Sequence, residues 1–375
     1  MDLDASLHWL GLSVTPGLGA RLTSRLLKAF GTPEAVFAAS LTALESCRLP
    51  AAVAQAIHSR DPLKAAEKEL AELRKLDGKL VHWEEPDYPK RLLEIFDPPP
   101  LLYVRGDLSV LKRHALAMVG TRRPTPYGNL MAERIARDLA LRGLVIVSGL
   151  ARGIDSSAHK GALSATNGAT VGVLGTGLDV IYPKENRKLF AQVIERGALI
   201  TEFQLGCYPA PENFPIRNRI VAGVALGVVV VEGAQYSGSL ITARLAMEFG
   251  REVFGVPGHA TQPTSFAPHQ LIKQGAKLAA SWEDVVEELP TAVRAELFPV
   301  ETTTPEERAQ LFEASLGVTE KKLFDLLSAE EPRHVDELVE QSELNSSEVL
   351  ATLFELEMKG IVRQMPGKQF VKVLL

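Results

Sequence analysis

Residues 144–155 read Leu144-Val145-Ile146-Val147-Ser148-Gly149-Leu150-Ala151-Arg152-Gly153-Ile154-Asp155, and they carry the clearest signal of the fold. The opening apolar run fits a strand that is buried on both faces, as the strands of a parallel sheet are. A glycine-rich turn follows, and from residue 156 to residue 165 apolar side chains recur at the three- and four-residue spacing of a helix. The stretch therefore predicts a strand, a turn and a helix in succession.

The same unit repeats on both sides of this stretch. Strands are predicted at residues 116–119, 144–148, 170–174, 199–202, 227–232 and 252–256. Helices are predicted between them at residues 127–141, 156–165, 186–196, 217–225 and 239–249. Repeated units of this kind predict a parallel sheet that is covered by helices on both faces. We therefore expect an open, doubly wound α/β sheet from about residue 111 to residue 280.

Different patterns flank the sheet. The N-terminal part reads as short helices around a glycine-rich turn at residues 16–19, and the three prolines at 98–100 exclude regular helix there. The C-terminal part reads as three helices and a hairpin, with Asn345 and Glu348 as a helix cap, and this order suggests a winged helix. We predict a helical domain at 1–80, the sheet domain at 81–290, a linker rich in Pro, Thr and Glu at 291–316 and a winged helix at 317–375.

Composition limits the class of protein. The chain has 375 residues, 46% of them hydrophobic, which suffices for two or three globular units. Two cysteines alone, Cys47 and Cys207, build neither a disulfide framework nor a thiolate metal site, so we predict a cytoplasmic location. The first residues lack the basic segment of a secretion signal, and the longest run of apolar residues and glycine, 220–231, is too short for a membrane span.

The distribution of charge matters more than its total. A formal net charge of −5 argues against a nucleic-acid partner if the charge is evenly spread. Residues 113–280, however, hold 18 Lys and Arg against 11 Asp and Glu, an excess of seven positive charges. Residues 301–375 hold 8 against 15, an excess of seven negative charges. The sequence therefore predicts a basic sheet domain between acidic neighbours.

The turns after the strands carry groups that suit an anion. In an open α/β sheet, ligands bind at the carboxyl ends of the strands, where glycines expose backbone amides and arginines supply charged donors. We expect five cationic side chains to converge on one rim there: Arg122, Arg152, Lys184, Arg217 and Arg219. A polyanionic ligand explains such a cluster, although Asp155, Glu202 and Glu232 could neutralise part of it. Phe214, beside Pro215, is either a stacking platform for a nucleobase or a core anchor.

No catalytic site follows from the residues. Asp155 and His159 could do acid–base chemistry, but no Ser or Cys nucleophile stands out, and a structural role for His159 is favoured. Cys207 is expected to pack, while Glu202 and Glu232 are expected to position arginines. A P-loop is absent, and Gly175-Thr176-Gly177 fails as a dinucleotide fingerprint, since the third glycine position holds Val180. We predict no metal and no cofactor.

The turn motifs, taken in order, resemble the DNA-processing protein A family (DprA, also called Smf) over residues 88–276. They are Tyr88-Pro89, Asp97-Pro98-Pro99, Val119-Gly120-Thr121-Arg122, Ser148-Gly149-Leu150-Ala151-Arg152-Gly153-Ile154-Asp155, Asn213-Phe214-Pro215-Ile216-Arg217-Asn218-Arg219, Ser237-Gly238-Ser239-Leu240 and Gly250-Arg251-Glu252-Val253. The resemblance implies an extended Rossmann-like core that binds single-stranded DNA, forms homodimers and loads the RecA recombinase during natural transformation. It also implies help in displacing the single-strand-binding protein SSB, and the family is not known as an enzyme.

The resemblance also implies a set of DNA contacts. Together with neighbouring residues of the same turns, the expected DNA-binding residues are Arg122, Arg123, Ser148, Gly149, Arg152, Lys184, Phe214, Arg217, Arg219, Ser237, Gly238, Ser239 and Thr242. The glycine-rich turn at 16–19 resembles a helix-hairpin-helix or SAM-like module, for which packing is at least as good an explanation as phosphate binding. The expected recognition helix of the winged helix carries Glu348, Glu355 and Glu357 against Lys359, so we interpret that domain as a protein-contact module.

Two other function classes stay open. The sheet also resembles that of the cytokinin-activating phosphoribohydrolases, nucleotide-processing enzymes with a P-G-G-x-G-T-x-x-E motif. Here the corresponding helix start reads Ser237-Gly238-Ser239-Leu240-Ile241-Thr242, without the double glycine. A transcription factor that works through the winged helix is the third possibility, and it requires that residues 301–375 bind duplex DNA.

Overall fold

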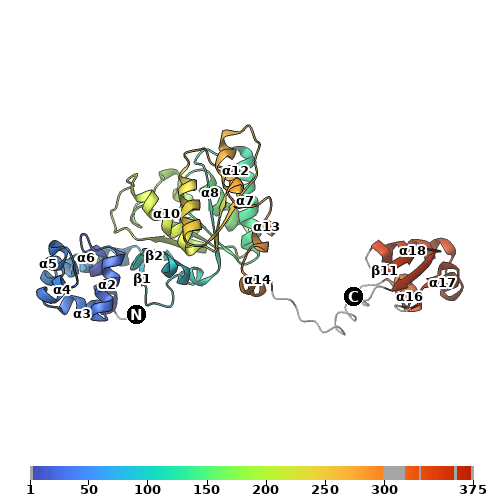
Figure 1. Cartoon of the computed structure of the whole chain (residues 1–375), viewed down its shortest axis with the longest axis horizontal. Helices are drawn as coiled ribbons and strands as arrows, with labels where there is room; N and C mark the ends of the chain where they lie inside the picture. The colour runs from blue at the N-terminus through green and yellow to red at the C-terminus, as the bar shows by residue number, and fades with distance from the viewer. Residues whose placement is uncertain (1–2, 299–316, 329–330, 359–360, 373–375) are drawn as a thin grey trace. The chain divides into compact units, whose positions relative to one another are not determined.

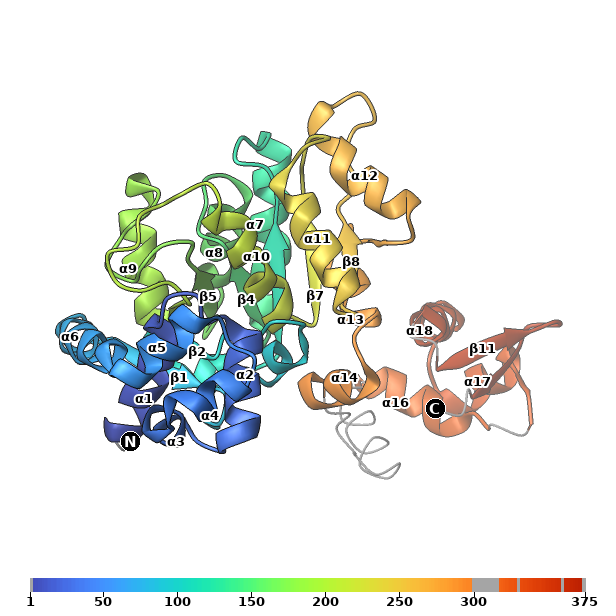
Figure 2. The same cartoon turned by 60° about the vertical axis from the view of Figure 1, so that its left-hand side comes forward.

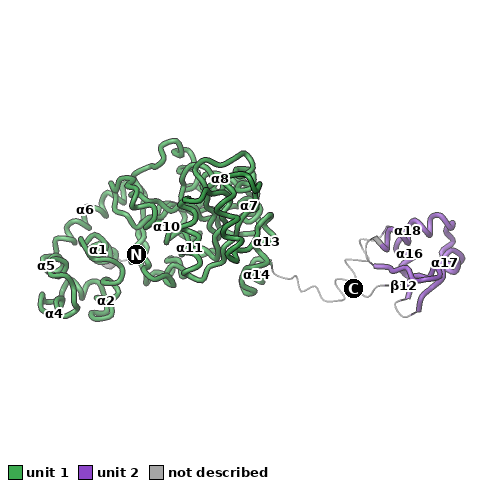
Figure 3. The backbone as a smooth tube through the Cα atoms, turned by 45° about the horizontal axis from the view of Figure 1, so that its top comes forward, with its two compact units in different colours: residues 1–299 green, residues 300–375 purple. Residues whose placement is uncertain are grey.

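The computed structural model describes residues 3–298, 317–328, 331–358 and 361–372. It divides into two compact units, Met1–Pro299 and Val300–Leu375 (Figure 3). Within the described residues, no helix is both long enough and apolar enough to cross a membrane.

The first unit contains a nine-stranded sheet. Its strands are β1 (Lys79–His82), β2 (Leu101–Gly106), β3 (Ala115–Val119), β4 (Val145–Ser148), β5 (Thr170–Val173), β6 (Gly197–Thr201), β7 (Gly227–Val230), β8 (Glu252–Gly255) and β9 (Lys277–Leu278). They lie in the order β1-β2-β6-β5-β4-β3-β7-β8-β9. Strands β3 to β9 pair with one another in parallel, whereas the β1–β2 and β2–β6 pairs are antiparallel. This confirms the predicted doubly wound, mostly parallel α/β sheet.

The direction of winding reverses between β3 and β7. From β3 the chain moves outward through β4 and β5 to β6, and then it returns to lay β7 on the other side of β3. Ligands of open α/β sheets bind at such a reversal, outside the carboxyl ends of the strands. The turns after β3 and β7 are therefore the place to look for a site.

Helices cover both faces of the sheet. They are α7 (Pro126–Leu141), α8 (Ile154–Ser164), α9 (Arg187–Arg196), α10 (Asn213–Val224), α11 (Gly238–Glu248), α12 (Phe266–Lys273) and α13 (Trp282–Glu287). Figure 2 shows α10 and α11 side by side in front of the sheet, and both lie against the same face. Helices α7, α8 and α13 contribute to the core on the opposite face (Figure 1).

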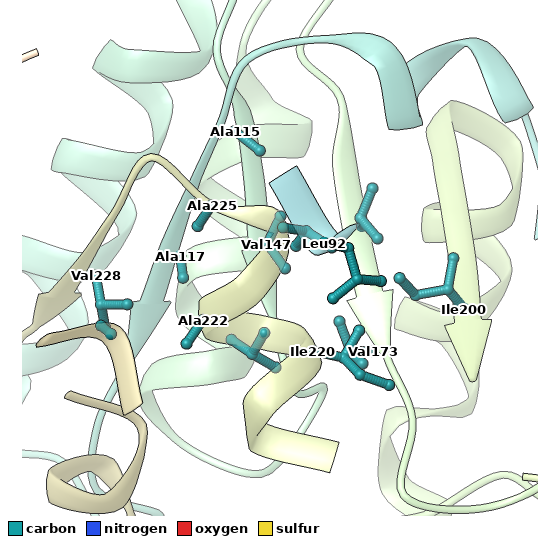
Figure 4. Packing of buried hydrophobic residues seen from close by; sticks show 14 of the residues in the cluster. Leu92, Ala115, Ala117, Val147, Val173, Ile200, Ile220, Ala222, Ala225 and Val228 are labelled. Carbon is teal, nitrogen blue, oxygen red and sulfur yellow. The ribbon is translucent and has the colours of Figure 1, made fainter. Parts of the chain in front are cut away.

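The alternation of residues along β3 explains this layering. Ala115, Ala117 and Val119 belong to the core beneath α10 and α11, where Ala117 lies close to Ala222 of α10 (Figure 4). Leu116 and Met118 belong to the core beneath α7 and α8. Successive side chains of a strand point to opposite faces, so one apolar strand supplies both cores.

The structure corrects the predicted start of one helix. The sequence pattern predicts a helix from Arg217 and a turn at residues 213–216, whereas α10 begins at Asn213. Pro215 lies in its first turn, where backbone N–H groups have no partner within the helix and proline is tolerated. The motif that the sequence presents as a loop is therefore a rigid helix N-terminus.

The structure also differs from the predicted domain boundaries at both ends of the sheet domain. Strands β1 and β2 extend the sheet, and the predicted boundary at residue 80 falls inside β1. Part of the predicted linker is helical, since α14 (Thr291–Leu297) buries Val293 in the core. The rest of that linker, residues 299–316, lies outside the described residues.

Six helices precede the sheet: α1 (Leu3–Val14), α2 (Ala20–Phe30), α3 (Pro33–Ala38), α4 (Leu41–Ser46), α5 (Ala51–Ser59) and α6 (Asp61–Lys75). Their shared core contains Leu12, Leu26 and Ile57. Helices α1 and α6 also pack against the sheet, where Trp9 and Leu73 join β2 and α9 in one cluster. The helical segment is therefore continuous with the sheet core.

The second unit has its own core. It comprises α16 (Val318–Leu326), β10 (Arg333–His334), α17 (Val335–Ser342), α18 (Ser346–Met358), β11 (Val362–Met365) and β12 (Gln369–Lys372), with the strands in the order β10-β12-β11. The Asn345 side chain accepts a hydrogen bond from Glu348 N at 2.9 Å, and the Glu348 carboxylate accepts one from Asn345 N at 3.3 Å. This cap and the β11–β12 hairpin match the predicted order of elements in a winged helix.

Candidate functional site

A cavity of about 740 Å³ lies at the reversal point of the sheet. It is lined by residues of the turn after β3 (119–123), by the first turns of α10 (214–218) and by the turn after β7 with the start of α11 (234–242). Ala151, Asp155 at the start of α8, Tyr182, Pro209 and Pro211 complete the lining. A smaller cleft adjoins it, lined by Arg122, Gly149, Arg152, Tyr182, Pro183 and Phe214. The predicted site residues therefore do meet at the carboxyl edge of the sheet, with three exceptions described below.

Arginines dominate the rim. Arg122 and Arg123 are exposed on the turn after β3, and neither forms an ion pair with any residue that the structure describes. Arg152 is also exposed, and it forms an ion pair with Glu185. Three guanidinium groups are thus available to an anionic ligand from solvent.

Arg217 is buried and organises the floor of the site. Its guanidinium donates a hydrogen bond to Val173 O and packs on Gly149, where any Cβ would overlap it. Burial lowers the pKa of Arg217 to about 10, an effect that the Asp155 carboxylate opposes, so Arg217 remains charged at neutral pH. Gly149 is glycine because a buried cation occupies the space beside it.

Asp155 balances that buried cation. Its carboxylate accepts hydrogen bonds from Gly149 N at 3.2 Å and from Ala151 N at 3.4 Å. Burial raises the pKa of Asp155, while Arg217 and the two amide donors oppose the rise. The predicted neutralisation by Asp155 thus concerns Arg217 first and Arg122 to a smaller extent, while no ion pair is formed by Arg122 or Arg123 with any residue that the structure describes.

Phe214 is surrounded by cationic and aromatic groups. The Cζ atoms of Arg122 and Arg217 lie 5.5 Å and 5.9 Å from its ring centroid, and the Tyr182 ring lies 5.6 Å away at an angle of 44°. Guanidinium groups at such distances are attracted to an aromatic ring. Phe214 therefore holds two arginines of the site in place, and its ring is half-buried.

Glu232 positions the turn that carries Arg122 and Arg123. Its buried carboxylate accepts hydrogen bonds from Thr125 N at 2.9 Å and from Thr125 Oγ1 at 2.6 Å. The backbone adds a bond from Thr121 N to Glu232 O at 2.7 Å. Glu232 therefore acts on the arginines through the backbone on either side of them, rather than by direct ion pairing.

The N-terminus of α11 completes the rim. The Ser237 side chain caps the helix by accepting a hydrogen bond from Ser239 N at 3.3 Å. A Cβ at Gly238 would meet no atom within 4 Å, so a ligand can approach this backbone closely. Helix N-termini carry partial positive charge and bind phosphate and other anions. Ser239 and Thr242 lie behind this opening as buried residues of the lining.

Three expected site residues lie outside both cavities. Arg219 donates hydrogen bonds to Glu202 at 2.6 Å and to Asp97 at 3.1 Å, away from the rim. The expected convergence of Arg219 with Arg217 is therefore wrong, because residues two apart in a helix point about 200° apart. Ser148 is buried and donates to Met118 O at 2.6 Å, while Lys184 is exposed one residue beyond the smaller cleft.

Two other candidates have structural partners. His159 is fully buried, with Nδ1 2.7 Å from Thr170 Oγ1, and burial lowers its pKa to about 3. This supports the structural interpretation of His159. Cys207 is half-buried, and its Sγ accepts a hydrogen bond from Asn213 Nδ2 at 3.5 Å, so it packs as expected.

Two aromatic residues of the cavity, Tyr182 and Tyr236, are not among the predicted site residues. Both stand in turns at the carboxyl edge of the sheet, next to residues that were selected as site candidates. An aromatic residue in an otherwise polar turn was the available signal.

The fold and the site together define a class. The doubly wound sheet has exposed guanidinium groups, aromatic rings and a helix N-terminus at its reversal point, the place where open α/β sheets commonly carry sites for phosphate-bearing ligands.

Comparison with known proteins identifies the family. The family model described as DNA recombination-mediator protein A matches residues 79–290, and the DprA winged helix domain matches residues 305–368. Protein Smf of Escherichia coli is 40% identical over 82% of this chain and 80% of its own length, and DNA processing protein DprA of Bacillus subtilis is 45% identical over 54% of this chain and 68% of its own. The chain belongs to the DNA recombination-mediator protein A (DprA/Smf) family.

Solved structures agree with this assignment. The X-ray structure of DprA from Streptococcus pneumoniae superposes with a TM-score of 0.66 and 35% identity, covering 76% of this chain and 98% of that one. DNA processing protein A from Helicobacter pylori, which is described as having a unique single-stranded DNA binding mode, superposes with a TM-score of 0.51 and 30% identity, covering 56% of this chain and 98% of its own.

Proposed function

We propose that this protein binds single-stranded DNA across the cavity at the reversal point and acts as a recombination mediator. One observation carries the proposal. Arg122 and Arg123 are exposed on the turn after β3, and hydrogen bonds to Glu232 hold the backbone of that turn. The open N-terminus of α11 lines the same cavity. Rigidly held cations without carboxylate partners are suited to a phosphate chain. The aromatic rings beside them can stack on unpaired bases. Bases in duplex DNA are paired and stacked on one another, so they are not available to these rings.

The proposed set of DNA-contacting residues is smaller than the set predicted from the sequence. Arg122, Arg123 and Arg152 are the proposed phosphate contacts, with Lys184 next to them and Gly238 at the helix N-terminus. Arg217 and Phe214 shape the site from within. Arg219 and Ser148, which the resemblance includes among the DNA contacts, are proposed to be structural, because their polar groups bond to other parts of the protein.

A salt series tests DNA binding. We expect the full chain to bind fluorescent oligo-dT, and Arg122→Ala to weaken that binding and to lower the slope of log affinity against log salt by about 0.7, the share of one phosphate on a single strand. Arg134, exposed on α7 outside both cavities, provides a matched control, and Arg134→Ala should leave the slope unchanged. Equal slopes for the wild type and Arg122→Ala would reject this site.

The specific cellular role that we propose is the one that the resemblance to the DprA/Smf family implies. We propose that the protein, as a cytoplasmic homodimer, loads RecA onto incoming single strands and helps to displace SSB during natural transformation by homologous recombination. On SSB-coated single-stranded DNA, the wild type should shorten the lag before RecA hydrolyses ATP, and Arg122→Ala should not. An unchanged lag with the wild type would contradict mediation, and release of free adenine from AMP would support the nucleotide-processing alternative instead.

A further inference from the structure

Tyr236 is an aromatic residue whose side chain is exposed to solvent. Its side chain is 92% exposed, the most exposed of the large tyrosine and phenylalanine side chains in the described structure. It stands in a tight turn between β7 and α11, closed by a hydrogen bond from Ser237 N to Ala234 O at 3.0 Å. Aromatic rings contribute to folding by burying apolar area, and a ring that is 92% exposed buries almost none of its own.

The position of this ring is informative. Tyr236 lines the 740 Å³ cavity, and it directly precedes Ser237 and Gly238 at the open N-terminus of α11. A phosphate at that N-terminus would therefore lie beside the tyrosine ring. A nucleotide whose phosphate lies at the helix N-terminus would thus have its base on the side of the cavity that Tyr236 lines.

The neighbouring ring is less available. Phe214 already has the guanidinium groups of Arg122 and Arg217 within 6 Å of its centroid, and Tyr182 is tilted against it. Gly175 packs close to its ring as well, since a Cβ there would lie 3.1 Å from the Phe214 ring. Phe214 is thus largely occupied by the protein, whereas Tyr236 has its ring free.

We propose that Tyr236 is a base-stacking platform for an unpaired nucleobase whose phosphate lies at the N-terminus of α11. This inference rests on the proposed binding of single-stranded DNA, and it names the residue that grips a base rather than the backbone. Stacking on an aromatic ring tolerates any base, because every base offers a flat face. The platform adds affinity for single strands without sequence preference, and it excludes a duplex whose bases are already paired.

A fluorescent base tests the platform in the full-length protein. Oligo-dT is prepared with a single 2-aminopurine at successive positions, since stacking on a tyrosine or phenylalanine ring quenches this base. At one position we expect the bound wild type and Tyr236→Phe to quench 2-aminopurine strongly, and Tyr236→Leu to leave it bright. Tyr236→Leu should also weaken binding about tenfold, the effect of losing one stacked base.

A second exposed tyrosine provides the control. Tyr208 is 79% exposed but does not line the cavity, so Tyr208→Leu should keep both the quenching and the affinity of the wild type. An abasic site at the quenched position should weaken binding by the wild type and Tyr236→Phe, but not by Tyr236→Leu.

The outcomes separate the two proposals. If the wild type binds oligo-dT and Tyr236→Leu shows the same quenching and affinity, the platform is rejected while the proposed function stands. If the wild type does not bind oligo-dT, the proposed function fails, and the platform fails with it.

Discussion

At the scale of single residues, exposure divides the arginines into two roles. Arg217 is buried against Gly149 and Phe214 and shapes the site, whereas Arg122 and Arg123 reach solvent. The sequence predicted which residue types gather at this edge, because strand ends and glycine-rich turns are visible in it. It could not show which arginine faces the ligand, since that depends on packing between segments distant in the chain.

Buried His159 gives a prediction about pH. Burial lowers its pKa from 6.5 to about 3, so the folded state keeps the ring neutral while the unfolded chain can protonate it. The stability that this group contributes is therefore complete above pH 6.5 and is lost as the pH falls toward 3. We expect His159 by itself to contribute a loss of about 1.4 kcal/mol in the free energy of unfolding for each pH unit between 6.5 and 3, to which His82, with its pKa lowered to about 4, adds.

Urea unfolding at pH 7, 6 and 5 measures this loss. Trp9, Trp83 and Trp282 are the three tryptophans of the chain, so tryptophan fluorescence follows the first unit alone. His159→Gln removes the titrating group and should flatten the dependence on pH by about one proton. Parallel pH profiles for the wild type and His159→Gln would show that His159 titrates normally.

At the scale of elements, the strands of the parallel sheet were predictable and the antiparallel extension was not. Continuous apolar runs such as residues 227–230 indicate strands buried on both faces. Strand β2 follows three prolines, and its partner β6 lies about a hundred residues further on, so no local pattern indicates that pairing. The start of α10 was missed because Pro215 reads as a helix breaker, although the first turn of a helix tolerates proline.

The early start of α10 gives a prediction for Arg219. This arginine points away from the site and forms an ion pair with Glu202. Burial raises the pKa of the Glu202 carboxyl, and the charge of Arg219 opposes that rise. Arg219→Ala would leave Glu202 without its cation, and we expect the free energy of unfolding to fall by about 3 kcal/mol. Because Arg219 lies outside the cavity, affinity for oligo-dT should change by less than a factor of about two.

The Arg122→Ala variant is expected to show the opposite pattern to Arg219→Ala. Arg122 is exposed, so its removal should weaken DNA binding with little effect on urea unfolding. If Arg219→Ala instead weakened binding and left stability unchanged, Arg219 would be a DNA contact, as the family resemblance implies.

At the scale of the whole molecule, charge and fold divide the chain in the same way. The basic segment lies within the first unit, and the seven excess negative charges lie in the second, which has its own hydrophobic core. On α18, Leu350 and Phe354 are exposed one turn apart, and Glu348 and Glu355 are exposed on another side of the helix, so its exposed side chains suit protein contacts rather than phosphate.

Deletion of the second unit tests this division. Removing residues 300–375 changes the formal net charge from −5 to +2, and the first unit keeps its complete core. We expect the truncated chain to bind oligo-dT at least as tightly as the full chain in a fluorescence anisotropy titration, with the largest gain at low salt. A tenfold weaker affinity would mean that the C-terminal unit contacts DNA.

The most direct test of the central claim is a crystal structure of the full chain with a short oligo-dT. The strand should cross the cavity between the turn after β3 and the N-terminus of α11, with phosphates at Arg122 and Gly238 and a thymine on Tyr236. A strand bound to another surface, with this cavity empty, would contradict the account.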